Sequence, residues 1–145
     1  MRKSGPVSEF VGLSTPERQD VDFEFFIPQH PRVGGFSGQQ RARRERYLRP
    51  VVARIERPLP FHVKLAVEYS FVFIGPEFDL SGRNRLLRTD IDNLLKFVND
   101  LLTGVVWEDD SQIFEMRAVK RHGSESGIGL RVWILEGETG TEAGL

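Results

Sequence analysis

The sequence predicts an α+β fold, a single small domain in which a mixed sheet of about four or five strands carries two packed helices. Residues 61–74 alternate between apolar and other side chains, which is typical of a strand. Residues 92–102 repeat apolar side chains at helical spacing. A length of 145 residues suits one domain. Such a chain buries roughly two thirds of its unfolded surface.

The strand predicted over 61–74 is the clearest element. Its alternation predicts one buried and one exposed face, with Glu68 and its alternate neighbours on the exposed side. Further strands are predicted at 22–27, 112–120 and 128–135. The apolar residues expected on the buried face are Phe61, Val63, Leu65, Val67, Tyr69, Phe71 and Phe73.

Two helices are predicted. Residues 39–57 are rich in arginine, and Pro50 should kink or divide the helix that they form. The second helix should start at about Asp92, which would cap it, and should end at Gly104. A new extended stretch is expected over 105–107. The apolar stripe of the second helix consists of Leu94, Leu95, Val98, Leu101 and Leu102.

The domain is expected to span residues 22–136. Residues 1–21 are rich in Ser, Pro, Gly and charge, so a flexible segment is predicted there, and 137–145 should be a flexible acidic tail. Cysteine is absent, which excludes disulfides and zinc–thiolate sites. No membrane span or secretory signal is visible, so we expect a cytoplasmic protein, nucleoid-associated or phage-encoded if the host is bacterial.

Four carboxylates and one ammonium lie within 21 residues, and they are Asp90, Asp92, Asp109, Asp110 and Lys96. Clustered like charges repel unless a cation neutralises them. Oxygen ligands without cysteine or histidine suit Mg²⁺, with Mn²⁺ as a substitute. Carboxylates that hold Mg²⁺ beside a lysine are typical of chemistry on a phosphate.

The spacing predicts where these side chains point. Asp90 and Asp92 share a face only if residues 90–92 are extended, with Ile91 turned into the core. Lys96 then lies on the same helix face as Asp92. Taken singly, each acid has an ordinary explanation as a helix cap, a solvated turn or a surface ion pair. Their joint occurrence favours a functional site.

The segment from Asp90 to Gln112 resembles the signature of the RusA family of Holliday-junction resolvases, D-x-D-N-x-x-K, D-x-L-x-G, then an aromatic residue and D-D-x-Q. The resemblance implies a small α+β homodimer that cuts branched, four-way DNA with Mg²⁺. It also implies that Asp90, Asp92 and Asp110 are the essential acids and that Lys96 is the essential lysine. The matching positions are Asp90, Asp92, Asn93, Lys96, Asp100, Leu102, Gly104, Trp107, Asp109, Asp110 and Gln112.

The leading hypothesis is therefore a Mg²⁺-dependent, structure-specific endonuclease in which Asp90, Asp92 and Asp110 hold one or two metal ions. Lys96 would donate to a nonbridging phosphate oxygen or to the attacking water. Residues that could orient the carboxylates are Asn93, Asp109 and Gln112. Basic residues expected to contact the DNA backbone are Arg41, Arg43, Arg44, Arg46, Arg83, Arg85, Arg88, Lys120 and Arg121.

The net charge of −1 is an objection to a DNA enzyme, because DNA-binding domains are usually basic. However, the acidic excess lies outside the predicted core: residues 1–22 and 136–145 together hold 3 basic and 7 acidic residues, whereas 23–135 hold 17 basic and 14 acidic residues. Two other hypotheses stay open. One is a non-cleaving module that binds junctions or a protein, and the other is hydrolysis of a sugar bond by two carboxylates.

Overall fold

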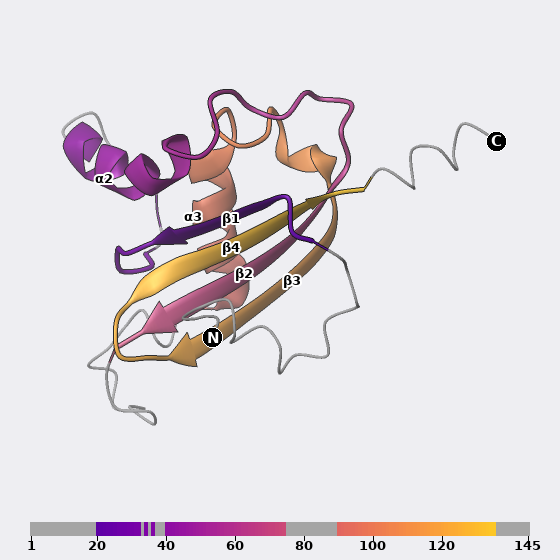
Figure 1. The fold of residues 1–145 in the computed structure, drawn as a ribbon. Coiled ribbons are helices and arrows are strands. Elements are labelled where there is room, and N and C mark those ends of the chain that lie inside the picture. Colours follow the sequence, from indigo (N-terminus) through magenta and orange to yellow (C-terminus); the bar gives the residue numbers. More distant parts are fainter. Residues whose placement is uncertain (1–19, 33, 35, 37–39, 75–89, 136–145) are drawn as a thin grey trace.

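The computed structural model describes residues 20–32, 34, 36, 40–74 and 90–135, and these form a four-stranded mixed sheet with helices packed on it (Figure 1). The strand order is β1-β4-β2-β3. β2 runs parallel to β3 and antiparallel to β4, which in turn is antiparallel to β1. The α+β prediction is therefore confirmed. The strands are β1 (Phe23–Ile27), β2 (Leu65–Phe73), β3 (Ile113–His122) and β4 (Gly127–Ile134).

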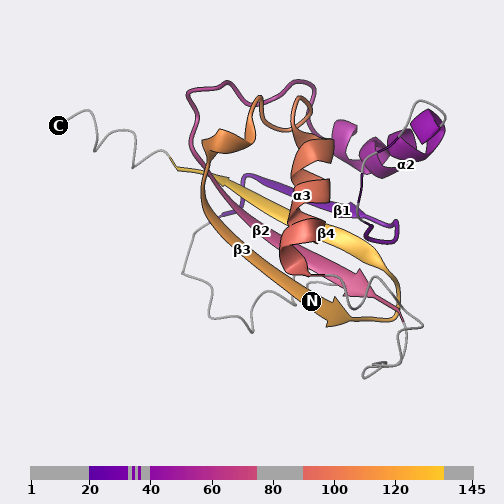
Figure 2. The same ribbon diagram turned by 180° about the vertical axis from the view of Figure 1, so that it is seen from behind.

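Two α-helices lie in the described part of the chain, α2 (Arg41–Val52) and α3 (Ile91–Leu102). α3 crosses one face of the sheet, and α2 packs beside β1 and α3 (Figure 2). Their apolar faces share one core with the sheet, in which the rings of Tyr47 and Phe97 meet edge to face at 5.5 Å. The buried positions of α3 are Leu94, Phe97, Val98, Leu101 and Leu102.

β2 is buried along its whole length, so the prediction that one of its faces is exposed is wrong. The strand lies between β4 and β3, and neighbouring side chains therefore shield both of its faces. Phe61, predicted on the buried face, lies before β2 and is 63% exposed. The alternation identified the strand but could not show that it lies between two other strands of the sheet. That position is the reason why its second face is buried as well.

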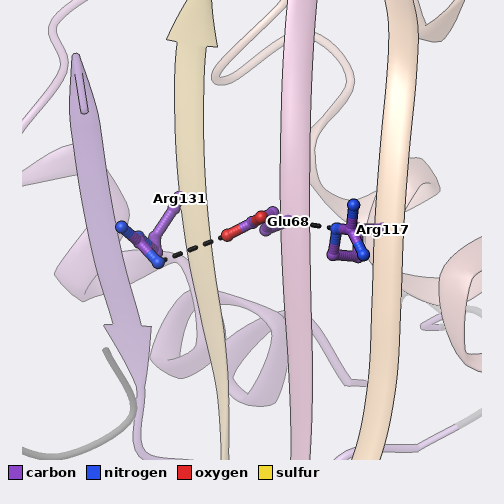
Figure 3. A network of polar contacts seen from close by, with 3 residues as sticks. All are labelled: Glu68, Arg117 and Arg131. Carbon is purple, nitrogen blue, oxygen red and sulfur yellow. Dashed lines mark hydrogen bonds and ion pairs between the residues drawn. The ribbon is translucent and has the colours of Figure 1, made fainter. Parts of the chain in front are cut away.

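Glu68 is the buried charge on the sheet face opposite α3 (Figure 3). It stands in register with Arg117 of β3 and Arg131 of β4. The Arg131 Nη1 atom is 3.3 Å from Glu68 Oε1, and the Arg117 Nε atom is 3.6 Å from Glu68 Oε2. A carboxylate that is only 4% exposed is therefore compensated from both neighbouring strands.

Several element boundaries differ from the prediction. α2 ends at Val52, and Pro50 lies inside its last turn without dividing it. α3 starts at Ile91 with Asp90 as N-cap, so Asp92 is not the cap. Residues 104–106 form a turn, and Trp107 makes only isolated β-bridges, with Leu59 and Thr103, instead of belonging to a strand. The Gly/Arg-rich segment 75–88, most of the predicted flexible N-terminal segment and the acidic tail lie outside the described residues.

Candidate active site on helix α3

The start of α3 presents the first pair of acids. The Asp90 backbone is extended at φ −65° and ψ 147°, and its side chain makes no capping hydrogen bond. Its carbonyl oxygen accepts from the backbone N–H groups of Asn93 and Leu94. Asp92 lies in the first helical turn, where the helix dipole favours a negative charge. Both carboxylates are exposed and hold no hydrogen bond to another described residue.

Lys96 follows Asp92 by four residues and is exposed on the same side of α3. No ion pair to another described residue holds its ammonium group. It lines a cavity of about 390 Å³ between α2 and α3, together with Arg44, Asn93 and Asp100. The lysine is therefore available to a ligand that approaches the helix from this side.

The end of α3 carries the second pair of acids. Gly104 has φ +88°, a conformation that glycine adopts readily, and it ends the helix as predicted. Its N–H donates to the Trp107 carbonyl oxygen at 2.7 Å. Trp107 is fully buried, and its Nε1 donates to Thr103 Oγ1 at 3.2 Å. The chain is thus turned back against the helix end just before Asp109 and Asp110.

Gln112 fastens this acidic turn to the segment before β2. Its Oε1 accepts from the N–H groups of Glu108 and Asp109 at 2.9 and 3.0 Å. Its Nε2 donates to the carbonyl oxygens of Pro60 and Val63 at 2.8 and 3.0 Å. The side chain is only 2% exposed. Its amide is committed to backbone groups, so it positions the turn and contacts no carboxylate.

Asp109 and Asp110 have different roles in that turn. Asp109 is the N-cap of the 3₁₀ turn η3 (Asp110–Gln112), and it accepts from the Ser111 N–H at 3.0 Å. This hydrogen bonding lowers the pKa of Asp109. Asp110 is exposed, and its carboxylate makes no hydrogen bond to another described residue. Of the two, Asp110 is therefore the free carboxylate.

The charge of Asp110 affects the pKa of Tyr69 in β2. Its hydroxyl donates to Asn99 Oδ1 of α3 at 2.7 Å. Burial raises the pKa of Tyr69, the hydrogen bond with Asn99 opposes this shift, and the charge of Asp110 adds to it. Asp110 exerts this effect from η3, the turn that follows the end of α3.

The two acid sets lie toward opposite ends of α3. Asp92 lies in the first turn of α3, Asp110 lies in η3 beyond the end of α3, and the whole helix is about 18 Å long. Figure 2 shows α3 running from its start near the ends of β2 and β3 to the turn that leads into β3. In the described residues, no group of three acidic or histidine side chains could hold a metal ion. One chain therefore does not bring Asp90, Asp92 and Asp110 together.

The arginines of α2 point to two cavities. Arg44 lines the cavity beside Lys96, whereas Arg43 and Arg46 line a second cavity of about 420 Å³ with Arg32. Burial raises the pKa of Tyr47, and the positive charges of Arg32, Arg43 and Arg46, which line the same cavity as Tyr47, oppose this shift. The sequence did not single out Arg32, because one arginine in a Pro/Gly loop gives no periodic signal.

The remaining predicted DNA contacts are less concentrated. Arg41 is exposed at the start of α2. Lys120 and Arg121 are half-buried near the end of β3. Arg83, Arg85 and Arg88 lie outside the described residues. The described basic side chains therefore gather mainly on α2 and the loop before it.

The family model of endodeoxyribonuclease RusA matches residues 36–133. The chain belongs to the RusA endodeoxyribonuclease family. This family acts on branched DNA and resolves Holliday junctions, and the matched region contains both acid sets and Lys96. No curated protein matched the chain. No helix in the described part of the chain is long and apolar enough to cross a membrane.

Proposed function

We propose that this chain resolves four-way DNA junctions by Mg²⁺-dependent hydrolysis, with Asp90, Asp92 and Asp110 as metal-holding acids. The observation that carries the proposal is that some polar side chains of the motif are hydrogen-bonded within the fold and others are not. The side chains of Asp109 and Gln112 make local hydrogen bonds. The three acids and Lys96 are exposed, and their side chains make no hydrogen bond or ion pair with another described residue. Exposed carboxylates that the fold itself does not use are suitable oxygen ligands for a hard cation.

When bound, Mg²⁺, or Mn²⁺ in its place, would supply Lewis-acid stabilisation and activate a water for attack on the phosphate. The protein groups have separate tasks. The acids hold a negative centre that attracts the cation, and Lys96 donates to a nonbridging oxygen of the phosphate or to the attacking water. Asn93 lines the same cavity as Lys96, where it could orient a carboxylate or contact the substrate.

We propose further that the active enzyme is a two-fold dimer. Because α3 separates the two acid sets in one chain, the start of α3 from one protomer would meet the acidic turn of its partner. Two-fold symmetry makes this contact twice and produces two equal sites. Two sites suit a substrate in which two opposed strands must be cut.

The DNA backbone would lie over the positive surface formed by Arg32, Arg43 and Arg46. The three arginines line one cavity, so they would supply several donors and positive charge to a phosphate that enters it. Arg41, Lys120 and Arg121 would extend the contact. A DNA substrate also suits a cytoplasmic or nucleoid location.

The test uses a labelled synthetic four-way junction and a matched linear duplex, each with Mg²⁺ or with a chelator. We expect paired, symmetric cuts in the junction, with Mg²⁺ only. A second candidate is a module that binds junctions without cutting them, and the separation of the acids within one chain favours it. Tight junction binding without any Mg²⁺- or Mn²⁺-dependent cleavage would establish that alternative.

A further inference from the structure

We propose that the cavity between α2 and α3 binds one unstacked nucleobase of the strand that is cut, and that Asp100 discriminates among the bases. This inference rests on the proposed junction cleavage. The cavity has a volume of about 390 Å³, within the range of small-molecule sites. Its main lining residues are Phe36, Arg44, Asn93, Lys96, Phe97 and Asp100.

The cavity has an aromatic wall. The ring centroids of Phe36 and Phe97 are 5.7 Å apart, and those of Phe36 and Tyr47 are 5.5 Å apart. The Arg32 guanidinium lies over the Phe36 ring, 4.5 Å from its centroid, and helps to hold it in place. A nucleobase stacks well on aromatic rings, because every base has a π-face.

Asp100 is the part of the motif that the metal chemistry does not use. It lies in the last turn of α3, where the helix dipole disfavours a negative charge and where the helix carries no basic residue. Its side chain is exposed and has no hydrogen-bond or ion-pair partner among the described residues. Asp100 forms no ion pair with Lys96 or Arg44 although both line the same cavity, so its carboxylate is available to a ligand there.

Asp100 shares its side of the helix with Asn93 and Lys96, because these positions are separated by three, four and seven residues. Lys96 therefore lies between the phosphate that is cut and the cavity for the base. Its ammonium serves the phosphate, and the cavity that it lines lies beside that phosphate. A base at a branch point can leave its stack at lower cost than a base inside a duplex.

The polar groups of the cavity favour some bases over others. An ionised Asp100 only accepts hydrogen bonds, so it matches the exocyclic amino group of adenine, cytosine or guanine. Thymine offers one ring N–H between two carbonyl oxygens, and both oxygens would face the carboxylate unfavourably. Asn93 donates and accepts, and Arg44 donates, so neither selects against thymine alone.

The first experiment maps cut sites on a library of four-way junctions with randomised sequence around the branch point. For the wild type we expect thymine to be depleted roughly tenfold at one fixed position beside the cut, a typical effect of one good base contact. Asp100→Asn adds a donor, so the depletion should disappear while cleavage persists. Glu125→Gln, the same loss of charge on the exposed β3–β4 turn, should keep the wild-type pattern.

Each outcome decides a separate question. Wild-type cutting with no base preference, or an unchanged preference in Asp100→Asn, would overturn the nucleobase site. Equal loss of cutting on every sequence in Asp100→Asn would also overturn it and assign Asp100 to the chemistry. A wild-type protein that binds the library and cuts none of it would instead refute the proposed function.

The second experiment measures the unstacking of a base under conditions in which no cleavage occurs. A 2-aminopurine probe is placed in turn at each position beside the cut, and the junction is bound with a chelator present. We expect a fluorescence rise at one position with the wild type and a clearly smaller rise with Phe36→Ala, at protein concentrations that saturate binding. No rise at any position would overturn the proposal independently of cleavage.

Discussion

Mixing two inactive variants should restore nicking, because the acids of one site are expected to come from two chains. Asp92→Asn removes an acid from the start of α3, and Asp110→Asn removes one from the turn beyond its end. Both side chains are exposed and hold no described hydrogen bond, so neither change should impair folding. Each variant alone should lose more than about 100-fold in cleavage rate, since even groups behind metal ligands commonly contribute 10- to 100-fold.

The size of the recovery follows from symmetry. In a heterodimer of these two variants, one site carries both substitutions and the other carries neither. Random exchange at equal concentrations makes about half of the dimers heterodimers, so about one quarter of the sites should be intact. Because each heterodimer has a single working site, the product should be a nicked junction without the second, opposed cut.

The assay follows a circular or end-labelled junction that distinguishes one cut from two, with heterodimers isolated through different affinity tags. The matched control mixes Asp90→Asn with Asp92→Asn, two acids from the same end of α3. Every site of that heterodimer lacks one acid, so it should stay inactive. Isolated Asp92→Asn/Asp110→Asn heterodimers that do not nick would refute the shared site and return all the acids to one chain.

Three further predictions concern single residues. Lys96→Ala should lose cleavage while junction binding changes little, and Lys96→Arg should recover little, because a planar fork replaces a compact charge; full rescue by arginine would contradict a specific role. Gln112→Ala should lower the free energy of unfolding in urea by about 3 kcal/mol, because it leaves several buried backbone groups without partners, whereas a loss within error would show that the turn is held by other contacts. The chain has two tyrosines, Tyr47 and Tyr69, and burial raises both pKa values above 10.0. This contribution to stability is present below pH 10 and is lost as pH rises further, so ultraviolet titration should show phenolate near pH 10 only in the unfolded protein.

The sequence was sufficient for the fold class because its patterns are local. Alternation over 61–74 predicted the strand that became β2, and Gly104 predicted the end of α3 through its backbone freedom. The burial of Glu68 could not be predicted in this way. It depends on Arg117 and Arg131, which become its neighbours only when three strands pair.

The candidate site shows the same limit. The acids and Lys96 were selected by residue type and spacing, and the structure leaves all of them exposed except Asp109, which is half-buried. Spacing could not separate Asp109 from Asp110, because the difference is one hydrogen bond to the Ser111 N–H. The spacing also could not show that α3 keeps the two acid sets apart. Asp110 follows Asp90 by 20 residues, and a chain of that length can either return to the start of the helix or stay at its end.

The separation of the acids has a physical advantage for an enzyme that cuts DNA. Three carboxylates gathered in one free chain would repel each other and would bind Mg²⁺ wherever the protein met DNA. With Asp92 and Asp110 toward opposite ends of α3, the isolated chain carries little of that repulsion and holds no complete site. Assembly would bring the charges together, and a bound cation would then offset their repulsion, so metal binding and dimer formation favour each other by linkage. Cleavage would thereby become conditional on two protomers, an arrangement that suits a substrate with two opposed strands.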